Sequence, residues 1–185
     1  MSSVIRFIVS LPLDFLRALL KPFGYVVVRD KSTIDYFLHE YSSYEEYRDT
    51  QVKFNLQKIQ NVWADEATLR RVAEIARGLP GRSNITGLCH GARNGFEQKF
   101  LNEDDRFSVL GTDISPSATD FPDSVQWDFH DENQEWIGKF DFVYTNSLDQ
   151  SWQPKKAVEV WLRQLKSDGV LIIEHTELHG PVGAS

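Results

Sequence analysis

From Asn84 onward the sequence alternates between short apolar runs and stretches with helical spacing. The apolar runs have the length of strands, and turn residues such as glycine, proline and aspartate separate them. The predicted strands cover residues 85–89, 107–112, 124–127, 140–145 and 170–174, with helices at about 95–102 and 154–166 and a turn at 167–169. Strands that alternate with helices indicate a parallel sheet with right-handed crossovers. We therefore predict an α/β fold for residues 81–185.

Residues 1–31 differ from the rest because they are both apolar and basic. They contain five basic side chains and two acidic ones, a local charge of +3. Because the whole chain has a net charge of −7, residues 32–185 carry a charge of −10. Charged residues and Pro12 interrupt the apolar run, which argues against a spanning helix, and no small-residue cleavage site indicates a secretory signal. The amphipathic segment 13–20 favours either contact with an anionic membrane surface or packing on protein, including a partner in a homo-oligomer.

Residues 32–80 are predicted to form a helical extension in front of the sheet. Ser32 and Thr33 offer helix N-caps, and a second helix is expected over residues 65–77, ended by the segment 78–81. The apolar stripe of the second helix consists of Leu69, Val72, Ala73 and Ala76. The first helix carries Tyr41, Tyr44 and Tyr47 at a spacing of three, which indicates a packing face or a lid over a substrate site.

Charge and cysteine content exclude several classes of function. A net charge of −7 argues against general nucleic-acid binding, which needs a basic surface. The single cysteine, Cys89, excludes an intrachain disulfide framework and a cysteine-based zinc cluster, so we predict no metal site and a reducing, cytoplasmic location, with peripheral contact to a membrane as a further option.

Residues that follow the predicted strands are the candidates for ligand binding. In an open parallel sheet, ligands bind outside the carboxyl ends of the strands. The candidates that follow strands one to four are Cys89, His90, Gly91, Asp113, Ile114, Asp128, Phe129 and Asn146.

These residue types suit a nucleoside. Gly91 lets the backbone approach a ligand closely, and the Asp113 carboxylate can accept hydrogen bonds from both ribose hydroxyls. Asp128 can accept from an adenine amino group, while Ile114 and Phe129 can hold the ring between them.

Residues 84–174 resemble the core of the class I S-adenosylmethionine-dependent methyltransferases. The segments 140–149 (FDFVYTNSLD) and 161–173 (WLRQLKSDGVLII) are similar to the family's stretch FDxVxxNxxL…LxxxLKpGGxLxI. A subset of such proteins has a similar Cys-His-Gly loop at 89–91, Asp-Ile-Ser at 113–115 and Gln-Trp-Asp-Phe-His at 126–130. The resemblance implies a Rossmann-like parallel sheet and S-adenosyl-L-methionine as cofactor, held by the strand-end residues.

The sequence also departs from the family's pattern. The first motif, acid-x-Gly-x-Gly-x-Gly, retains only its middle glycine, Gly91, because Gly87 replaces the acid while Cys89 and Arg93 replace glycines. We expect the loop to hold the methionyl part of the cofactor through its backbone, with His90 or Arg93 facing the carboxylate. The family continues past strand five into a helix and two antiparallel strands, whereas only residues 176–185 remain here. We expect either a chain that is cut short or a shortened domain whose open edge is covered by residues 1–80 or by a partner chain.

The resemblance implies transfer of a methyl group. The acidic charge of the residues after 31 argues against phosphate-rich acceptors, so we expect a small molecule, sugar or glycan. Candidates for the base that removes the acceptor's proton are His175, Asp149 and His130. The alternative is an inactive methyltransferase-like fold that serves as a membrane-proximal or assembly module. The altered glycine loop and the apolar, basic segment 1–31 favour this alternative. The segment from Thr86 to Gly91 also resembles the turn of short-chain dehydrogenases, but no tyrosine has the lysine four residues later that this chemistry requires.

Overall fold

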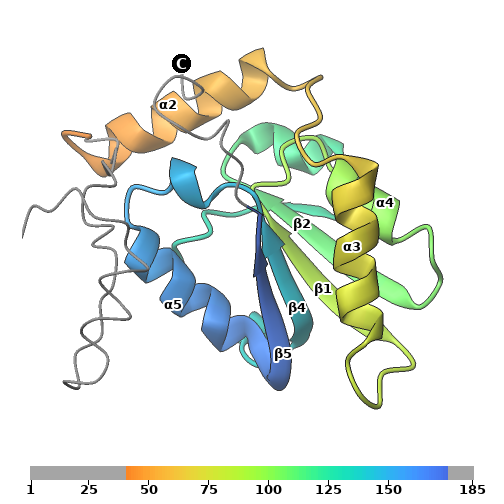
Figure 1. The fold of residues 1–185 in the computed structure, drawn as a ribbon. Coiled ribbons are helices and arrows are strands. Elements are labelled where there is room, and N and C mark those ends of the chain that lie inside the picture. The colour runs from red at the N-terminus through yellow and green to blue at the C-terminus, as the bar shows by residue number, and fades with distance from the viewer. Residues whose placement is uncertain (1–40, 175–185) are drawn as a thin grey trace, which may run out of the picture. The chain divides into compact units, whose positions relative to one another are not determined.

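The computed structural model of the chain describes residues 41–174 (Figure 1). The predicted caps Ser32 and Thr33, the basic segment 1–31 and the candidate base His175 lie outside these residues. The elements are α2 (Tyr44–Gln57), α3 (Glu66–Arg77), β1 (Ile85–His90), α4 (Phe96–Leu101), β2 (Phe107–Asp113), η2 (Pro116–Asp120), β3 (Ser124–Gln126), η3 (Gln134–Trp136), β4 (Phe140–Thr145), η4 (Leu148–Gln150), α5 (Pro154–Gln164) and β5 (Leu165–Ile173), where η denotes a 3₁₀ turn. No helix of residues 41–174 is long and apolar enough to cross a membrane.

The five strands form one parallel sheet in the order β3-β2-β1-β4-β5, which confirms the predicted α/β class. β1 lies at the centre and pairs with β2 on one side and β4 on the other, so that Cys89 is opposite both Gly111 and Tyr144. Every residue of β4 is buried, as expected for a central strand of a sheet that is covered on both faces.

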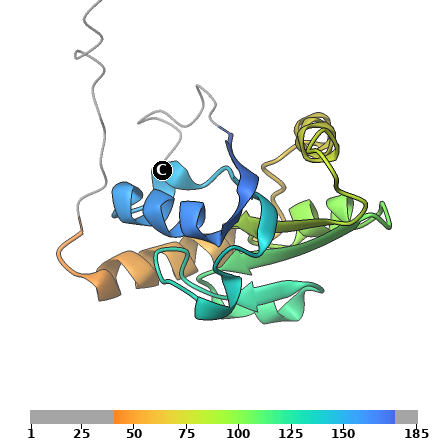
Figure 2. The same cartoon turned by 90° about the horizontal axis from the view of Figure 1, so that it is seen from below.

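Helices cover both faces of the sheet. Figures 1 and 2 show α5 on one side of the strands and α3 on the other. The predicted stripe of α3 is buried in a core with Ile85 and Phe107. On the other face, Trp161 of α5 packs with Leu88 and Val143.

Local capping explains where the two N-terminal helices begin. The Asp65 side chain accepts a hydrogen bond of 2.7 Å from the backbone N–H of Thr68, so α3 begins where the sequence predicted. The Ser43 hydroxyl accepts a hydrogen bond of 3.2 Å from Glu46 N–H at the start of α2. Because Ser43 caps the helix, Tyr41 lies before α2, and the prediction that the helix includes Tyr41 was wrong.

The predicted turn at residues 167–169 was also wrong, because β5 runs without interruption from Leu165 to Ile173. The strand keeps its pairing to β4 through a register shift: Phe140 pairs with Leu165 but Phe142 pairs with Val170. Gly169 permits this irregularity, since a Cβ atom there would lie 3.0 Å from the carbonyl oxygens of Phe140 and Asp141. Residues 167–169, which have the composition of a turn, are therefore part of an irregular strand.

Mutations at a buried and at an exposed leucine near α5 should differ in their effect on stability. Leu88 is completely buried between β1 and α5, whereas Leu162 on α5 is 53% exposed. We expect Leu88→Ala to lower the free energy of unfolding by about 2–5 kcal/mol, since it removes buried methyl groups and leaves a cavity. The control Leu162→Ala should change it by less than about 0.5 kcal/mol. Urea unfolding of both variants measures the difference, and equal losses would contradict the described core.

Candidate functional site

A cavity of approximately 340 Å³ lies at the carboxyl ends of the strands and is lined in part by α2. Figure 1 shows α2 beyond these strand ends. The volume of the cavity is in the range of small-molecule sites, which is roughly 300–1,000 Å³. The sequence-predicted residues in its wall are Gly91, Asp113, Ile114, Asp128, Phe129, Asn146 and Asp149. The helix α2 and the loop after it add Tyr47, Gln51, Phe54, Asn55, Lys58, Asn61 and Trp63. Within residues 41–174, no group of three or more histidine, cysteine or acidic side chains is placed to hold a metal ion.

Gly91 forms the turn that opens the cavity at the end of β1. Its φ angle of 74° lies in the left-handed region, and a Cβ atom there would collide with the side chain of Ser147. Glycine is therefore required at this position for two reasons, the backbone angle and the close approach of the loop after β4.

Asp113 ends β2 with its carboxylate almost completely buried. Its Oδ1 accepts hydrogen bonds from the backbone N–H of Ser115 at 2.8 Å and from the side-chain amide of Asn55 on α2 at 2.6 Å. Burial raises the pKa of this carboxyl, and the hydrogen bonds from Ser115 and Asn55 together with the charge of Arg93 oppose that effect. Asn55 thus occupies an acceptor that a ligand hydroxyl could use.

Asp128 is the start of a hydrogen-bonded chain after β3. Its Oδ1 accepts from the backbone N–H of His130 at 2.9 Å and lies 2.7 Å from His130 Nδ1, while His130 Nε2 lies 2.6 Å from Ser151 Oγ. The Tyr44 hydroxyl donates to Oδ2 of Asp128 at 2.8 Å. Burial raises the pKa of Asp128, but the hydrogen bonds from His130 and Tyr44 outweigh it, so the pKa is lowered overall. Burial and the bond to Asp128 raise the pKa of Tyr44 to about 12.

Cys89 and His90 were predicted to bind cofactor, yet neither side chain lines the cavity. Cys89 is buried in the core on the face of α3 and α4. His90 Nδ1 lies 2.8 Å from Thr112 Oγ1, and its Nε2 lies 2.8 Å from Gln164 Oε1, with the ring stacked on Trp161. Burial lowers the pKa of His90 to about 4, so it is neutral at pH 7. The expectation that a His90 cation faces a ligand carboxylate is therefore corrected, because β1 continues through this residue.

Of the two candidate bases within residues 41–174, Asp149 lines the cavity and His130 does not. Asp149 lies in the cavity wall on η4, where Gln150 Nε2 donates to its Oδ2 at 2.8 Å. His130 is 1% exposed, with both ring nitrogens in hydrogen-bond contact with Asp128 and Ser151. Because His130 is buried and does not line the cavity, an acceptor bound there has no direct contact with its ring.

The structure adds two features to the predicted site, an unpaired amide on a predicted residue and an acid that the prediction missed. Asn146 was predicted to contact the ligand, and its Nδ2 is buried with no hydrogen-bond partner within residues 41–174. An unpaired buried donor is costly, so this atom is suited to a ligand acceptor. Glu97, which the sequence did not single out, lies on α4 and lines the same cavity. Its position just after the glycine-containing loop, at residues 91–95, is the signal that could have identified it.

Glu97 is almost completely buried, and burial raises the pKa of its carboxyl to about 7. A hydrogen bond from its own backbone N–H and the Arg93 cation lower the pKa, whereas the negative charges of Asp113 and Glu174 raise it further. The free protein therefore holds Glu97 half protonated near neutral pH.

This raised pKa predicts a pH-dependent stability. From an ordinary value of 4.5 to about 7, folded Glu97 keeps the proton that the unfolded chain has lost, so the free energy of unfolding falls as pH rises through that window. Glu97→Gln stays neutral and removes this fall, which amounts to about 3 kcal/mol. Urea unfolding at pH 4.5 and pH 8 should show wild type losing stability relative to the variant. The exposed control Glu103→Gln should follow wild type, and parallel curves for Glu97→Gln would contradict the burial of this acid.

Comparison with protein-family profiles and with curated protein sequences found no match. Solved structures do match the fold. The 1,6-didemethyltoxoflavin-N1-methyltransferase of Burkholderia thailandensis, crystallised with 1,6-didemethyltoxoflavin and S-adenosylhomocysteine, gives a TM-score of 0.58 at 19% identity over 76% of this chain and 69% of its own. The sugar N-methyltransferase KedS8 of a Streptoalloteichus species gives 0.51 at 20% identity, over 83% of this chain and 60% of its own.

A third solved structure, the [4+2]-cyclase SpnF, gives a TM-score of 0.52 at 16% identity, over 73% of this chain and 62% of its own. The chain thus spans between 60% and 69% of the length of these three proteins. At such identities the likeness establishes the fold alone. The parallel sheet in the order β3-β2-β1-β4-β5, flanked by helices, is the Rossmann-like α/β fold of the class I S-adenosylmethionine-dependent methyltransferases.

Proposed function

We propose that the chain binds S-adenosyl-L-methionine in the cavity at the strand ends and transfers its methyl group to a small-molecule, sugar or glycan acceptor. The observation that carries the proposal is the pair Asp113 and Asp128, which end neighbouring strands and line one cavity with Ile114 and Phe129. In this proposal Asp113 accepts from the ribose hydroxyls and Asp128 from the adenine amino group, with the two apolar side chains beside the ring.

The loop after β1 and the loop after β4 fit the rest of this cofactor. Gly91 leaves room where a Cβ atom would collide, and the unpaired Nδ2 of Asn146 offers a donor to a ligand oxygen. Arg93, also in the wall, carries a positive charge that suits a carboxylate. These groups form a cradle even though the family's other glycines are absent.

The cofactor supplies an electrophilic methyl group on a sulfonium, so the protein's own part is to position the acceptor and remove its proton. Asp149 is the wall residue that can take this proton, because it belongs to the loop after β4 and faces the cavity. Two fold neighbours support a sugar or small-molecule acceptor, since one is named a sugar N-methyltransferase and the other a 1,6-didemethyltoxoflavin-N1-methyltransferase.

Asp113 provides the direct test of cofactor binding. Asp113→Asn keeps the size of the side chain but removes the charge, and we expect it to weaken S-adenosylhomocysteine at least about tenfold, since hydrogen bonds to a charged group contribute about 1.5–3 kcal/mol. Isothermal titration calorimetry measures the affinity. The exposed control Asp105→Asn should bind as wild type does. Unchanged affinity in Asp113→Asn would exclude the proposed ribose contact.

One observation favours a second candidate, an inactive methyltransferase-like module. Side chains of α2 already bond both cavity acids, Asn55 to Asp113 and Tyr44 to Asp128. A protein that had lost its cofactor would benefit from such internal partners, because buried carboxylates need donors. The two candidates differ in titration of wild type: absence of binding at millimolar S-adenosylmethionine would exclude the enzyme and leave the module. For either candidate, it stays a prediction that residues 1–31 contact a membrane surface or a partner in a homo-oligomer. A cytoplasmic location also stays a prediction.

A further inference from the structure

Glu97 is a buried acid to which the proposed function has so far assigned no role. It is 6% exposed and lines the cavity from α4 (Phe96–Leu101). Within residues 41–174, no other side chain donates a hydrogen bond to its carboxyl group. Its own backbone N–H and the charge of Arg93 stabilise the ionised form, but burial outweighs both, and no side chain donates to the carboxyl. A buried acid that is satisfied only in part destabilises the protein that contains it, so we look for its role in the cavity that it faces.

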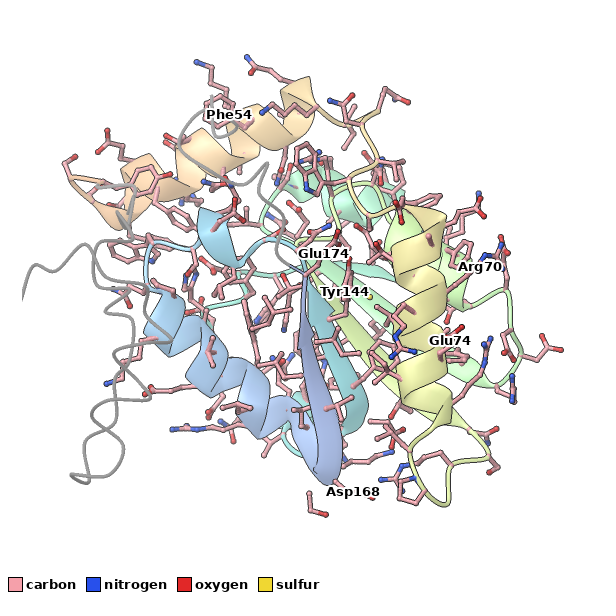
Figure 3. All side chains as sticks on the ribbon, viewed as in Figure 1. Phe54, Arg70, Glu74, Tyr144, Asp168 and Glu174 are labelled. Atoms are coloured by element: carbon pink, nitrogen blue, oxygen red, sulfur yellow. The ribbon has the colours of Figure 1, made fainter. Side chains whose placement is uncertain are left out.

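The titratable groups around Glu97 come from the ends of four strands. Glu97 interacts electrostatically with four titratable groups at these strand ends, which are Cys89 of β1, Asp113 of β2, Tyr144 of β4 and Glu174 after β5. Figure 3 shows Tyr144 and Glu174 together at the end of the strands nearest α2, where the Tyr144 hydroxyl donates to the Glu174 carboxylate. Arg93 is the cation that acts on Glu97, against the two acids Asp113 and Glu174. The surroundings are therefore short of positive charge.

The order of the strands determines which part of a ligand would reach this acid. With the ribose at Asp113 and the adenine at Asp128, the nucleoside covers β2 and β3 at one side of the sheet edge. The remainder of the ligand must then extend in the opposite direction, over β1 and β4. The wall there contains Gly91, Asn146 and Glu97, so the amino-acid end of the ligand meets these residues.

We infer that Glu97 binds the ammonium group of the ligand's amino-acid end, while Asn146 Nδ2 and Arg93 take its carboxylate. The inference rests on the proposed function. An ammonium group supplies a positive charge and donors in addition to the backbone N–H that Glu97 already has, and the ligand's carboxylate accepts from the buried Asn146 amide that has no partner within residues 41–174. Glu97 is thereby the residue that distinguishes a ligand with a free amino group from a bare nucleoside.

The packing of β1 gives an independent reason for the acid to come from α4. Gly87 stands where the methyltransferase motif has an acidic residue, and a Cβ atom there would collide with the ring of Phe142. An acid on β1 is therefore excluded by the core. Glu97 places a carboxylate over the end of the same strand from the next helix, at a position that the core leaves open to the cavity.

The test compares three ligands by calorimetry on the full chain at pH 8. S-adenosylhomocysteine has the amino group, its deamino analogue carries hydrogen in place of that group, and methylthioadenosine lacks the amino-acid end altogether. We expect wild type and the control Glu103→Gln to prefer S-adenosylhomocysteine over the deamino analogue at least about tenfold. Glu97→Gln should bind these two ligands equally and keep the wild-type affinity for methylthioadenosine.

Each result decides between the proposals. A wild type that binds methylthioadenosine but shows no preference for the amino group keeps the nucleoside site and overturns the role of Glu97. A preference that persists in Glu97→Gln overturns it as well. If wild type binds none of the three at millimolar concentration, the proposed function fails, and the inference fails with it.

A second measurement on wild type needs no variant and holds even if Glu97→Gln does not fold. The Glu97 carboxyl, with a pKa of about 7 in the free protein, must lose its proton to bind an ammonium group. From pH 8 to pH 6 the affinity for S-adenosylhomocysteine should fall about tenfold, since one proton is then displaced on binding. The affinity for the deamino analogue should not fall. Equal pH dependence of both ligands would overturn the inference.

Discussion

Parallel pairing of β1 with β2 on one side and β4 on the other is the constraint on which the rest of the structure depends. It brings the carboxyl ends of all five strands to one edge of the sheet. Residues far apart in the sequence, such as Gly91, Asp113 and Asn146, therefore line a single cavity. The same pairing requires a close approach at Gly87, because the ring of Phe142 on β4 fills the space beside it.

The helix α2 turns this edge from an open groove into a site with buried charges. Its contacts to Asp113 and Asp128 come from two turns of the helix, through Asn55 and Tyr44. Removal of water strengthens every electrostatic interaction below it and raises the pKa of carboxyls such as Glu97. Stability and ligand binding thus oppose each other at this edge, since the acids that destabilise the free protein are those that a cationic or hydroxyl-bearing ligand would satisfy.

Much of the fold could be predicted because it is encoded in local pattern. Strand β4 was predicted to its last residue from the apolar run 140–145, and α3 from its cap Asp65 and its apolar stripe. Errors arose where pairing between distant segments overrode local chemistry. Residues 167–169 have the composition of a turn, but their backbone is held in β5 by β4.

The location of the site at the strand ends was predicted correctly, but not every side chain that was expected to line it does so. Because β1 extends to His90, the side chains of Cys89 and His90 alternate into the two cores on opposite faces of the sheet, and neither reaches the cavity. A difference of one residue in the strand's end decided this outcome. Glu97 was missed for a related reason, since burial of an acid follows from elements that are remote in sequence.

The sequence by itself determined β1 to β4 to within about one residue, the cap of α3 and the strand-end positions of Asp113, Asp128 and Asn146, because spacing and residue type act locally. Only the tertiary structure decided which of these polar groups share a cavity and which are satisfied by α2. It also decided that, within residues 41–174, Asn146 Nδ2 lacks a partner and the Glu97 carboxyl lacks a side-chain donor. The physical reason is that desolvation and hydrogen bonding depend on every element packed around a group, and those elements come together only when the sheet has formed.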